Sequence, residues 1–264
     1  MEKSLPVKTS FIPIGVLVLA ALLMASLAPA FAGQPTGVEK EQALVLRRLA
    51  EAFMSEGRYR QALSELQKSQ KIDDTNAELH FDLGTVYLCL SQPDKAVASF
   101  KRALAINPDY SVAKNSLGAS LMAVGRYDEA IPVLEDLSEN LIYATPQFPL
   151  LNLGFIYFNK KQYDKALSYY KRATEASPGF AQAWRGLGRV YAVTGRLAES
   201  LEAYEKAVQA APYFALAFLE MGDVHETAGH GEEAVSAWKR ALELSQGTDL
   251  AGDVKKRLSR YAVP

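Results

Sequence analysis

The sequence has few of the residues from which catalytic and metal centres are built. Its 264 residues include one cysteine, Cys89, and three histidines. A single cysteine cannot form a disulfide within the chain. Because His80, His225 and His230 stand at no metal-ligand spacing from cysteine or carboxylate residues, we expect structural roles for them. No histidine lies at a diagnostic spacing from Cys89, which is therefore expected to be a small buried or groove-lining residue.

An excess of charge of either sign is also absent. The 29 lysines and arginines balance 30 aspartates and glutamates, so the sequence does not favour a nucleic-acid partner. Neither G-x-G-x-x-G nor G-x-x-x-x-G-K occurs, so no glycine-rich phosphate loop is predicted. The acidic residues, such as Glu202 and Glu232, fall on expected solvent-exposed helix faces. These absences predict a protein that is not an enzyme and that carries no metal or cofactor.

The first 32 residues have the pattern of a leader. Two lysines precede an apolar run over residues 11–27, and Ala30-Phe31-Ala32 is an A-x-A cleavage signature. The pattern predicts a signal peptide and a mature chain that begins at Gly33. The alternative is an uncleaved membrane anchor, but Pro13 and Pro29 shorten the helical stretch to about 15 residues, below the ~20 that span a bilayer. Either alternative predicts an exported chain, periplasmic or membrane-anchored and facing the periplasm.

What the sequence does contain is a period of 34 residues from 43 to 248. A small residue recurs in the middle of each first helix, at Ala50, Gly84, Gly118, Gly154, Gly188 and Gly222. Twelve residues beyond each comes another small one, at Ala62, Ala96, Ala130, Ala166, Ser200 and Ala234. Four residues further on stands a large one, at Leu66, Phe100, Leu134, Tyr170, Tyr204 and Trp238.

These spacings have a direct physical interpretation. Two small residues that face each other let two antiparallel helices approach closely, and the large residue fills the space beside them. Glycines after the first helix supply the turn, at Gly57, Gly125, Gly195 and Gly229. A proline then ends three of the second helices, at Pro108, Pro178 and Pro212. Each helix pair keeps an apolar face that it cannot bury alone, so neighbouring pairs must stack.

This pattern closely resembles the consensus of the tetratricopeptide repeat (TPR). The resemblance implies an all-α superhelical solenoid. Its six repeats are expected at 43–76, 77–110, 111–146, 147–180, 181–214 and 215–248. Residues 249–264 are expected to form a capping helix with one apolar stripe, and residues 33–42 a linker. One irregularity stands out: 36 residues separate Gly118 from Gly154, and the excess lies in the segment SENLIYATPQFP. We expect it to lengthen or loosen the corner between repeats three and four, either as a tolerated insertion or as part of a binding surface.

In TPR proteins the first helix of each repeat lines the concave side, so the resemblance also implies a binding groove. The residues predicted to line it are Phe81, Leu88, Asn115, Met122, Phe148, Leu151, Phe155, Phe158, Arg185 and Arg189. Four exposed phenylalanines would exceed the apolar patch usual on a soluble monomer. The hypothesis is that an amphipathic helix or an extended peptide lies there, with an acidic end near the two arginines.

Two alternatives stay open for these groove residues. The phenylalanine rings could pack between neighbouring repeats, and the arginines could simply be solvated. A lysine clamp for a C-terminal carboxylate, as in the chaperone-binding TPR proteins, is not expected, because Asn115 and Asn152 stand without its lysines.

The chain also resembles the pilotins of type IV pilus biogenesis, the PilF, PilW and Tgl-like proteins. The resemblance is closest where a Y-x-x-P segment, Tyr143 to Pro146, leads into PLLNLGFIYF with Asn152 and Gly154. It implies a scaffold that helps an outer-membrane secretin or another pilus component to assemble. Those pilotins are lipoproteins, and this leader lacks the cysteine that would carry the lipid, so a soluble or leader-held form is expected. The alternative function is an adaptor of an exopolysaccharide or other envelope assembly system.

Overall fold

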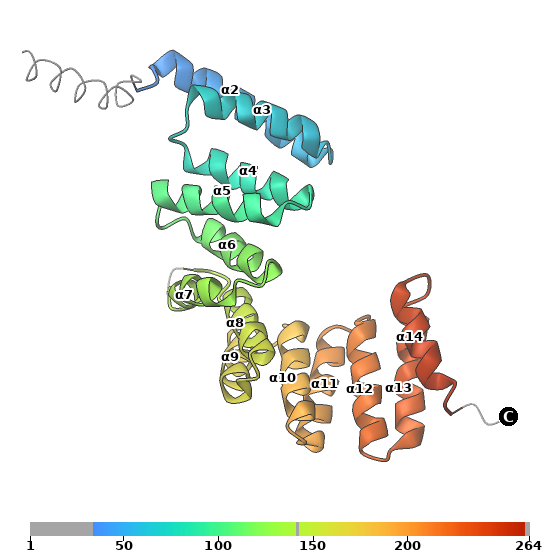
Figure 1. Cartoon of the computed structure of the whole chain (residues 1–264). Helices are drawn as coiled ribbons and strands as arrows, with labels where there is room; N and C mark the ends of the chain where they lie inside the picture. The colour runs from blue at the N-terminus through green and yellow to red at the C-terminus, as the bar shows by residue number, and fades with distance from the viewer. Residues whose placement is uncertain (1–33, 141–142, 262–264) are drawn as a thin grey trace, which may run out of the picture.

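The computed structural model describes residues 34–140 and 143–261, in which thirteen α-helices and no strands occur (Figure 1). The predicted leader lies outside the described residues. The helices form antiparallel pairs: α2 (Gly37–Ser55) with α3 (Tyr59–Ile72), α4 (Ala77–Cys89) with α5 (Pro93–Ile106), α6 (Ser111–Ala123) with α7 (Tyr127–Ser138), α8 (Gln147–Asn159) with α9 (Tyr163–Ala176), α10 (Ala181–Val193) with α11 (Leu197–Ala210), and α12 (Ala215–Thr227) with α13 (Gly231–Leu244). A thirteenth helix, α14 (Asp249–Leu258), packs on α13. The predicted fold, six repeats and a cap, is confirmed.

The expected linker at 33–42 is wrong from Gly37 onwards, because α2 begins there. Thr36 caps the helix: its Oγ1 accepts a hydrogen bond from the backbone N–H of Glu39 at 3.3 Å. In return, the Glu39 carboxylate accepts one from the backbone N–H of Thr36 at 2.7 Å. This reciprocal capping box requires threonine followed three residues later by glutamate, a signal that is present in the sequence. The first helix therefore extends six residues beyond the repeat period.

The small residue of each first helix lies against the large residue of its partner helix, as the spacing predicts. A Cβ atom added at Gly84 would lie 2.5 Å from the Phe100 ring, and one added at Gly188 would lie 2.8 Å from Tyr204. Both distances are shorter than van der Waals contact. The large residues are almost fully buried, including Phe100 and Trp238 at 0% exposure. Close helix packing in repeats two to six thus depends on the absence of a side chain at this position, whereas repeat one accommodates the buried methyl group of Ala50.

We therefore predict opposite effects of the same substitution at two helical glycines. In Gly154→Ala, the new Cβ would lie 2.6 Å from the Tyr170 ring, and overpacking should lower the free energy of unfolding by about 1–3 kcal/mol. Gly252 lies exposed in α14 with nothing within 4 Å of an added Cβ, so Gly252→Ala should raise the free energy of unfolding by about 0.5–1 kcal/mol. Urea unfolding of the two variants tests this. A Gly154→Ala variant as stable as the parent would contradict the packing argument.

The turns within the repeats use the left-handed backbone conformation. The predicted turn glycines all have positive φ, between 72° and 79°. Ser91 and Lys161 hold the same position in repeats two and four, with φ of 57° and 56°. The turn geometry is thus kept in all six repeats, although two of them place a side chain where glycine is favoured.

The corner between repeats three and four is longer than the others, as predicted. Eight residues, 139–146, connect α7 to α8, whereas four residues connect the second helix of each other repeat to the next repeat. Of the four extra residues in this connection, two come from the insertion. The other two arise because α7 is shorter, with 12 residues where the other second helices have 14. Leu141 and Ile142 lie outside the described residues. In Figure 1 the helix axes run across the view from α2 to α5 and steeply down it from α8 to α13, with the change of direction near this corner.

Candidate peptide-binding groove

Among three consecutive first helices, α8 contacts both α6 and α10, and the three form one wall of the superhelix. A groove of about 230 Å³ opens between them. Its lining residues are Met122, Leu151, Asn152, Phe155, Tyr170, Gln182, Arg185, Gly186 and Arg189. We call this the central groove. Five of the ten predicted site residues line it: Met122, Leu151, Phe155, Arg185 and Arg189.

Tyr170 of α9 separates α8 from α10 at the central groove. Its ring contacts the glycine positions on both sides, since a Cβ added at Gly154 or at Gly186 would lie 2.5–2.6 Å from it. The ring is only 3% exposed, and burial raises the pKa of Tyr170 to about 12, so its hydroxyl stays protonated at neutral pH. Because Gly186 has no side chain, it lines the groove with backbone atoms and lets the Tyr170 ring pack closely against α10. Tyr170 thus adds an uncharged, apolar ring to the floor of the central groove.

The apolar lining of the central groove is partly open to solvent. Phe155 is 37% exposed, although it lies at the middle of α8 rather than at an end. Met122 and Leu151 are half-buried beside it. Covering a phenylalanine side chain contributes roughly 1.5–3 kcal/mol, so an apolar side chain from a ligand would be stabilised here.

A second groove of about 260 Å³ lies beside the central groove and shares Arg189 with it. Phe158, also a predicted site residue, lines this second groove. The remaining lining residues are Ala192, Val193, Tyr204, Glu220, Asp223, Val224 and Thr227. The two grooves run from α6 to α12, so a segment longer than one side chain could lie along them.

The two predicted arginines are already paired within the chain. Arg185 donates two hydrogen bonds of 2.6 Å to the Glu220 carboxylate, and Arg189 lies 3.9 Å from the same carboxylate. Burial alone would lower the pKa of Arg185, but the hydrogen bonds and charge of Glu220 outweigh it and raise that pKa. Two positive charges therefore share one negative charge. One net positive charge remains for an acidic group of a ligand, not the two that the sequence suggested.

The predicted phenylalanines do not form one continuous open patch. Phe81 packs against Phe100 and Tyr110, with ring centroids 5.6 and 5.3 Å apart. Phe158 lies 5.8 Å from the Tyr163 ring and under the Arg189 guanidinium at 4.4 Å. Much of the surface of these two rings is therefore covered by other side chains of the protein and is not open to a ligand.

The other predicted residues lie outside both grooves. Phe148 is 41% exposed and meets Phe180 edge-on at 5.4 Å, and Leu88 is 38% exposed near the end of α4. Asn115 is half-buried, and its Oδ1 atom is buried without a hydrogen-bond partner. An unsatisfied buried oxygen costs about 1–3 kcal/mol, so Asn115 is a locally unfavourable position within the chain.

Tyr170, Gln182, Gly186, Tyr204 and Glu220 line the grooves but were missing from the predicted site. Gly186 and Glu220 occupy the same repeat position, where repeats one to four carry Arg48, Asp82, Ser116 and Asn152. Comparing the residues at this repeat position would have revealed the position as unusual, because its side chain is charged in some repeats, polar in others and absent at Gly186. Tyr170 and Tyr204 were assigned to the core from the period, and they reach the groove from the second helices.

Asp82, at that same repeat position, is 8% exposed, and its Oδ2 lies 3.6 Å from the Nε of Arg47. Burial raises the pKa of Asp82 to about 7; Arg47 opposes the shift, while Glu51 and Glu78 add to it. An unfolded aspartate titrates near pH ~4, so between pH ~4 and 7 the folded chain binds more protons than the unfolded chain. The contribution of Asp82 to stability therefore falls as the pH rises through this window.

We predict that Asp82→Asn raises the urea midpoint relative to the parent chain more at pH 8 than at pH 5.5. Asp73 is a matched control, since it is also 8% exposed. Burial acts to raise the pKa of Asp73, but hydrogen bonds from Thr75 outweigh it and lower that pKa. The effect of Asp73→Asn should thus be the same at both pH values. An equal effect of Asp82→Asn at the two pH values would contradict the assignment.

The histidines and the cysteine lie apart from the grooves. His80 is 2% exposed, and its Nε2 lies 3.1 Å from the backbone oxygen of Asp74. The rings of His225 and His230 face each other at 5.8 Å. Cys89 is exposed rather than buried. In the part of the chain that the structure describes, no three histidine, cysteine or acidic side chains come together as a metal site would require.

Three family models, each described as tetratricopeptide repeat, match residues 41–109, 87–141 and 151–213. Together these matches cover the first five of the six helix pairs, from α2 to α11. The chain is a tetratricopeptide-repeat protein. TPR proteins are generally protein-interaction scaffolds, and the grooves lie on the first helices, where the TPR resemblance places them.

Among curated proteins, the chain is similar to the type IV pilus assembly protein PilF of Pseudomonas aeruginosa, with 26% identity over 121 residues. The match covers 46% of this chain and 48% of PilF, so the chain spans about half the length of this relative. The crystal structure of PilW, described as a widely conserved type IV pilus biogenesis factor, has a TM-score of 0.71 and 24% identity, over 80% of this chain and 97% of PilW. The structure of Pseudomonas aeruginosa PilF has a TM-score of 0.68 and 19% identity, over 83% and 99%. At these identities the structural likeness establishes the TPR fold. No helix between residues 34 and 140 or between 143 and 261 is long and apolar enough to cross a membrane.

Proposed function

We propose that this TPR protein is a non-catalytic scaffold that holds a segment of a partner protein in the central groove. The observation that carries the proposal is the half-open apolar surface that Met122 of α6 and Leu151 and Phe155 of α8 form in the central groove. Peptide-binding grooves of this kind recognise alternate or helically spaced apolar side chains.

The ligand is an amphipathic helix or an extended peptide with an acidic group at one end. Its apolar side chains lie against Phe155, and its acidic group lies near Arg189, where one positive charge is not balanced by Glu220. The charges at this end also select against basic ligands. A basic group would face two arginines and only one carboxylate, Glu220. We therefore expect acidic and neutral segments to bind and basic segments to be rejected.

The partner is a component of a type IV pilus assembly machine, such as a secretin, and the scaffold acts in the cell envelope. The similarity to PilF and PilW supports this choice of partner. The leader-like sequence of residues 1–32 supports an exported, periplasm-facing location.

Photocrosslinking tests the function and the site together. A benzoylphenylalanine residue is placed at Phe155, inside the central groove, and in a matched chain at Tyr213, which is 82% exposed and lines neither groove. After irradiation of cells of the native host, we expect mass spectrometry to identify a pilus assembly component attached at position 155 and not at position 213. Attachment only at position 213 would show that the central groove is not the binding site. Attachment of polysaccharide assembly proteins at position 155 would show that the partner is not a pilus component.

A further inference from the structure

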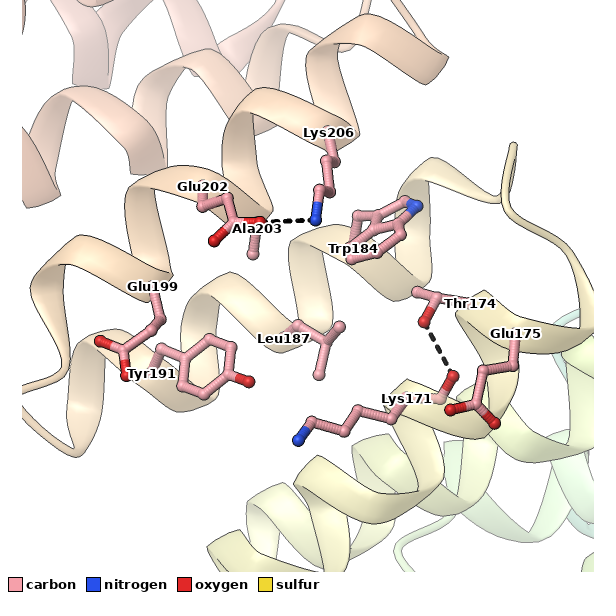
Figure 2. A pocket seen from close by; sticks show the side chains of 10 residues that line it. All are labelled: Lys171, Thr174, Glu175, Trp184, Leu187, Tyr191, Glu199, Glu202, Ala203 and Lys206. Carbon is pink, nitrogen blue, oxygen red and sulfur yellow. Dashed lines mark hydrogen bonds and ion pairs between the residues drawn. The ribbon is translucent and has the colours of Figure 1, made fainter.

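Helix α10 has a groove on each of its two sides. The central groove uses Gln182, Arg185, Gly186 and Arg189, whereas a groove of about 290 Å³ on the opposite side uses Trp184, Leu187 and Tyr191. The two sets lie about half a helical turn apart on a helix of 3.6 residues per turn. Figure 2 shows this outer groove, which α9 and α11 flank.

The equivalent position one repeat earlier is filled by a side chain of the protein itself. There Tyr169 of α9 stacks on Tyr157 of α8, with ring centroids 5.4 Å apart and planes at 1°. The Tyr169 hydroxyl donates a 2.9 Å hydrogen bond to the Glu135 carboxylate of α7. Arg172 lies over the Tyr169 ring at 5.5 Å and pairs with Glu139 at 2.7 Å, which links α7 to α9.

The repeat register shows why the outer groove is open. Thirty-four residues after Tyr157 and Tyr169 stand Tyr191 and Ala203, so the stacking platform is kept and the ring that covers it is replaced by a methyl group. The pair that links the second helices is also lost. Lys206, the counterpart of Arg172, bonds to Glu202 on its own helix at 2.6 Å and lies over the Trp184 ring at 4.8 Å.

The charged group at the repeat position of Glu135 has changed sign, although the carboxylates of Glu175, Glu199 and Glu202 also line the groove. Lys171 of α9 takes the repeat position of Glu135, and it makes no ion pair within residues 34–140 and 143–261. In Figure 2 its side chain runs past Leu187, which is itself only 3% exposed. Where Glu135 accepts a hydrogen bond from a phenol, Lys171 can donate one to a phenol oxygen.

We propose that the outer groove receives a tyrosine side chain presented by a partner protein. The incoming ring lies on Leu187 between Tyr191 and Trp184, and its oxygen accepts a hydrogen bond from Lys171. The size is adequate, because an apolar cavity of about 150 Å³ holds a benzene molecule. This site lies on the other side of α10 from the central groove, so it does not depend on the proposed function and could be occupied at the same time.

The test is an NMR titration with N-acetyltyrosinamide, which presents the ring alone. The chain has two tryptophans. The indole N–H of Trp184 donates to the Pro178 backbone oxygen at 2.8 Å and borders the groove, while that of fully buried Trp238 is an internal reference. We expect the Trp184 resonance to shift with half-saturation in the millimolar range and the Trp238 resonance to stay. No shift of the Trp184 resonance would overturn the proposal.

Three variants sharpen the result. Ala203→Tyr should fill the groove as Tyr169 does, raise the melting temperature and weaken binding of the probe at least tenfold. Lys171→Ala should weaken tyrosinamide binding about tenfold and leave binding of N-acetylphenylalaninamide unchanged. Phe155→Ala, on the other side of α10, should have no effect. The Lys171→Ala substitution requires no rearrangement of the groove, so it remains informative even if Ala203→Tyr fails to fold. If the Lys171→Ala variant binds tyrosinamide as tightly as the parent does, the proposal is overturned.

The tyrosine that enters the outer groove could also come from a second copy of this chain, in which Tyr213 is exposed. Sedimentation distinguishes that source from a separate partner protein. Sedimentation of the parent chain should show a monomer under the titration conditions. A dimer that Tyr213→Ser converts to a monomer, with the Trp184 resonance shifting on dissociation, would show that the groove serves self-association and would overturn the assignment to a separate partner.

Discussion

Alanine at both Met122 and Phe155 is expected to weaken binding of the groove ligand by about 100-fold or more. Each side chain covered by a ligand contributes roughly 1.5–3 kcal/mol, so loss of both removes at least ~3 kcal/mol of binding free energy, and each 1.4 kcal/mol is about tenfold in affinity. The ligand is the partner segment identified by crosslinking at position 155, made as a labelled peptide. Fluorescence anisotropy then measures its dissociation constant.

Two controls separate binding from folding in this experiment. Tyr213→Ala removes an aromatic side chain of similar size that is 82% exposed and outside the groove, and it should leave affinity within about twofold. The circular dichroism of the Met122 and Phe155 double variant should match that of the parent, because both side chains are partly exposed on α6 and α8. A loss of affinity below threefold would show that the apolar side chains do not hold the ligand.

Trp238→Ala is expected to destabilise the C-terminal end of the solenoid by about 3–5 kcal/mol. Trp238 is 0% exposed, lies against Gly222 and donates a 3.1 Å hydrogen bond from Nε1 to Asp223. The Asp223 carboxylate also accepts two hydrogen bonds from Arg257 of α14, at 2.5 and 2.9 Å. Removal of the indole thus leaves a cavity and also weakens the attachment of the capping helix.

Hydrogen exchange can show where this loss is felt. Repeats in a solenoid contact only their neighbours, so protection should fall in α12, α13 and α14 and persist in α4 to α7. Trp184→Ala is the matched control, since Trp184 is only half-buried and its loss should cost less. Equal loss of protection along the whole chain would contradict the view of locally coupled repeats.

The fold was accessible from the sequence because its information is periodic. The pairing of Gly84 with Phe100, or of Gly222 with Trp238, depends on sequence separations of 16 residues that recur in every repeat. Contacts of this kind are local in the chain, so helix geometry and one tight turn decide them. The two extra residues between Gly118 and Gly154 likewise predict the longer corner after α7. The start of α2 does not follow from the repeat period, because the capping box of Thr36 and Glu39 lies before the first repeat.

The site was predictable only in part, because the inner surface depends on contacts between repeats. Helical spacing placed Phe155, Leu151 and Met122 on the wall formed by the first helices, and the structure brings them into one groove. Spacing could not show that Phe81 packs on Tyr110, since the side-chain conformation depends on the neighbouring repeat. Nor could it show that Arg185 pairs with Glu220, 35 residues further along.

The sequence by itself determined the helix pairs, their number, the glycine contacts that hold each pair together and the apolar character of the inner wall. Each of these follows from residues within one repeat, where backbone geometry fixes which side chains meet. Only the tertiary structure decided which inner side chains remain exposed to solvent and which arginine charge is balanced by Glu220. It also decided that the outer groove beside α10, where Ala203 replaces the counterpart of Tyr169, is left unfilled. Those outcomes depend on the angle between stacked repeats, and a small rotation there changes every contact between side chains of neighbouring pairs.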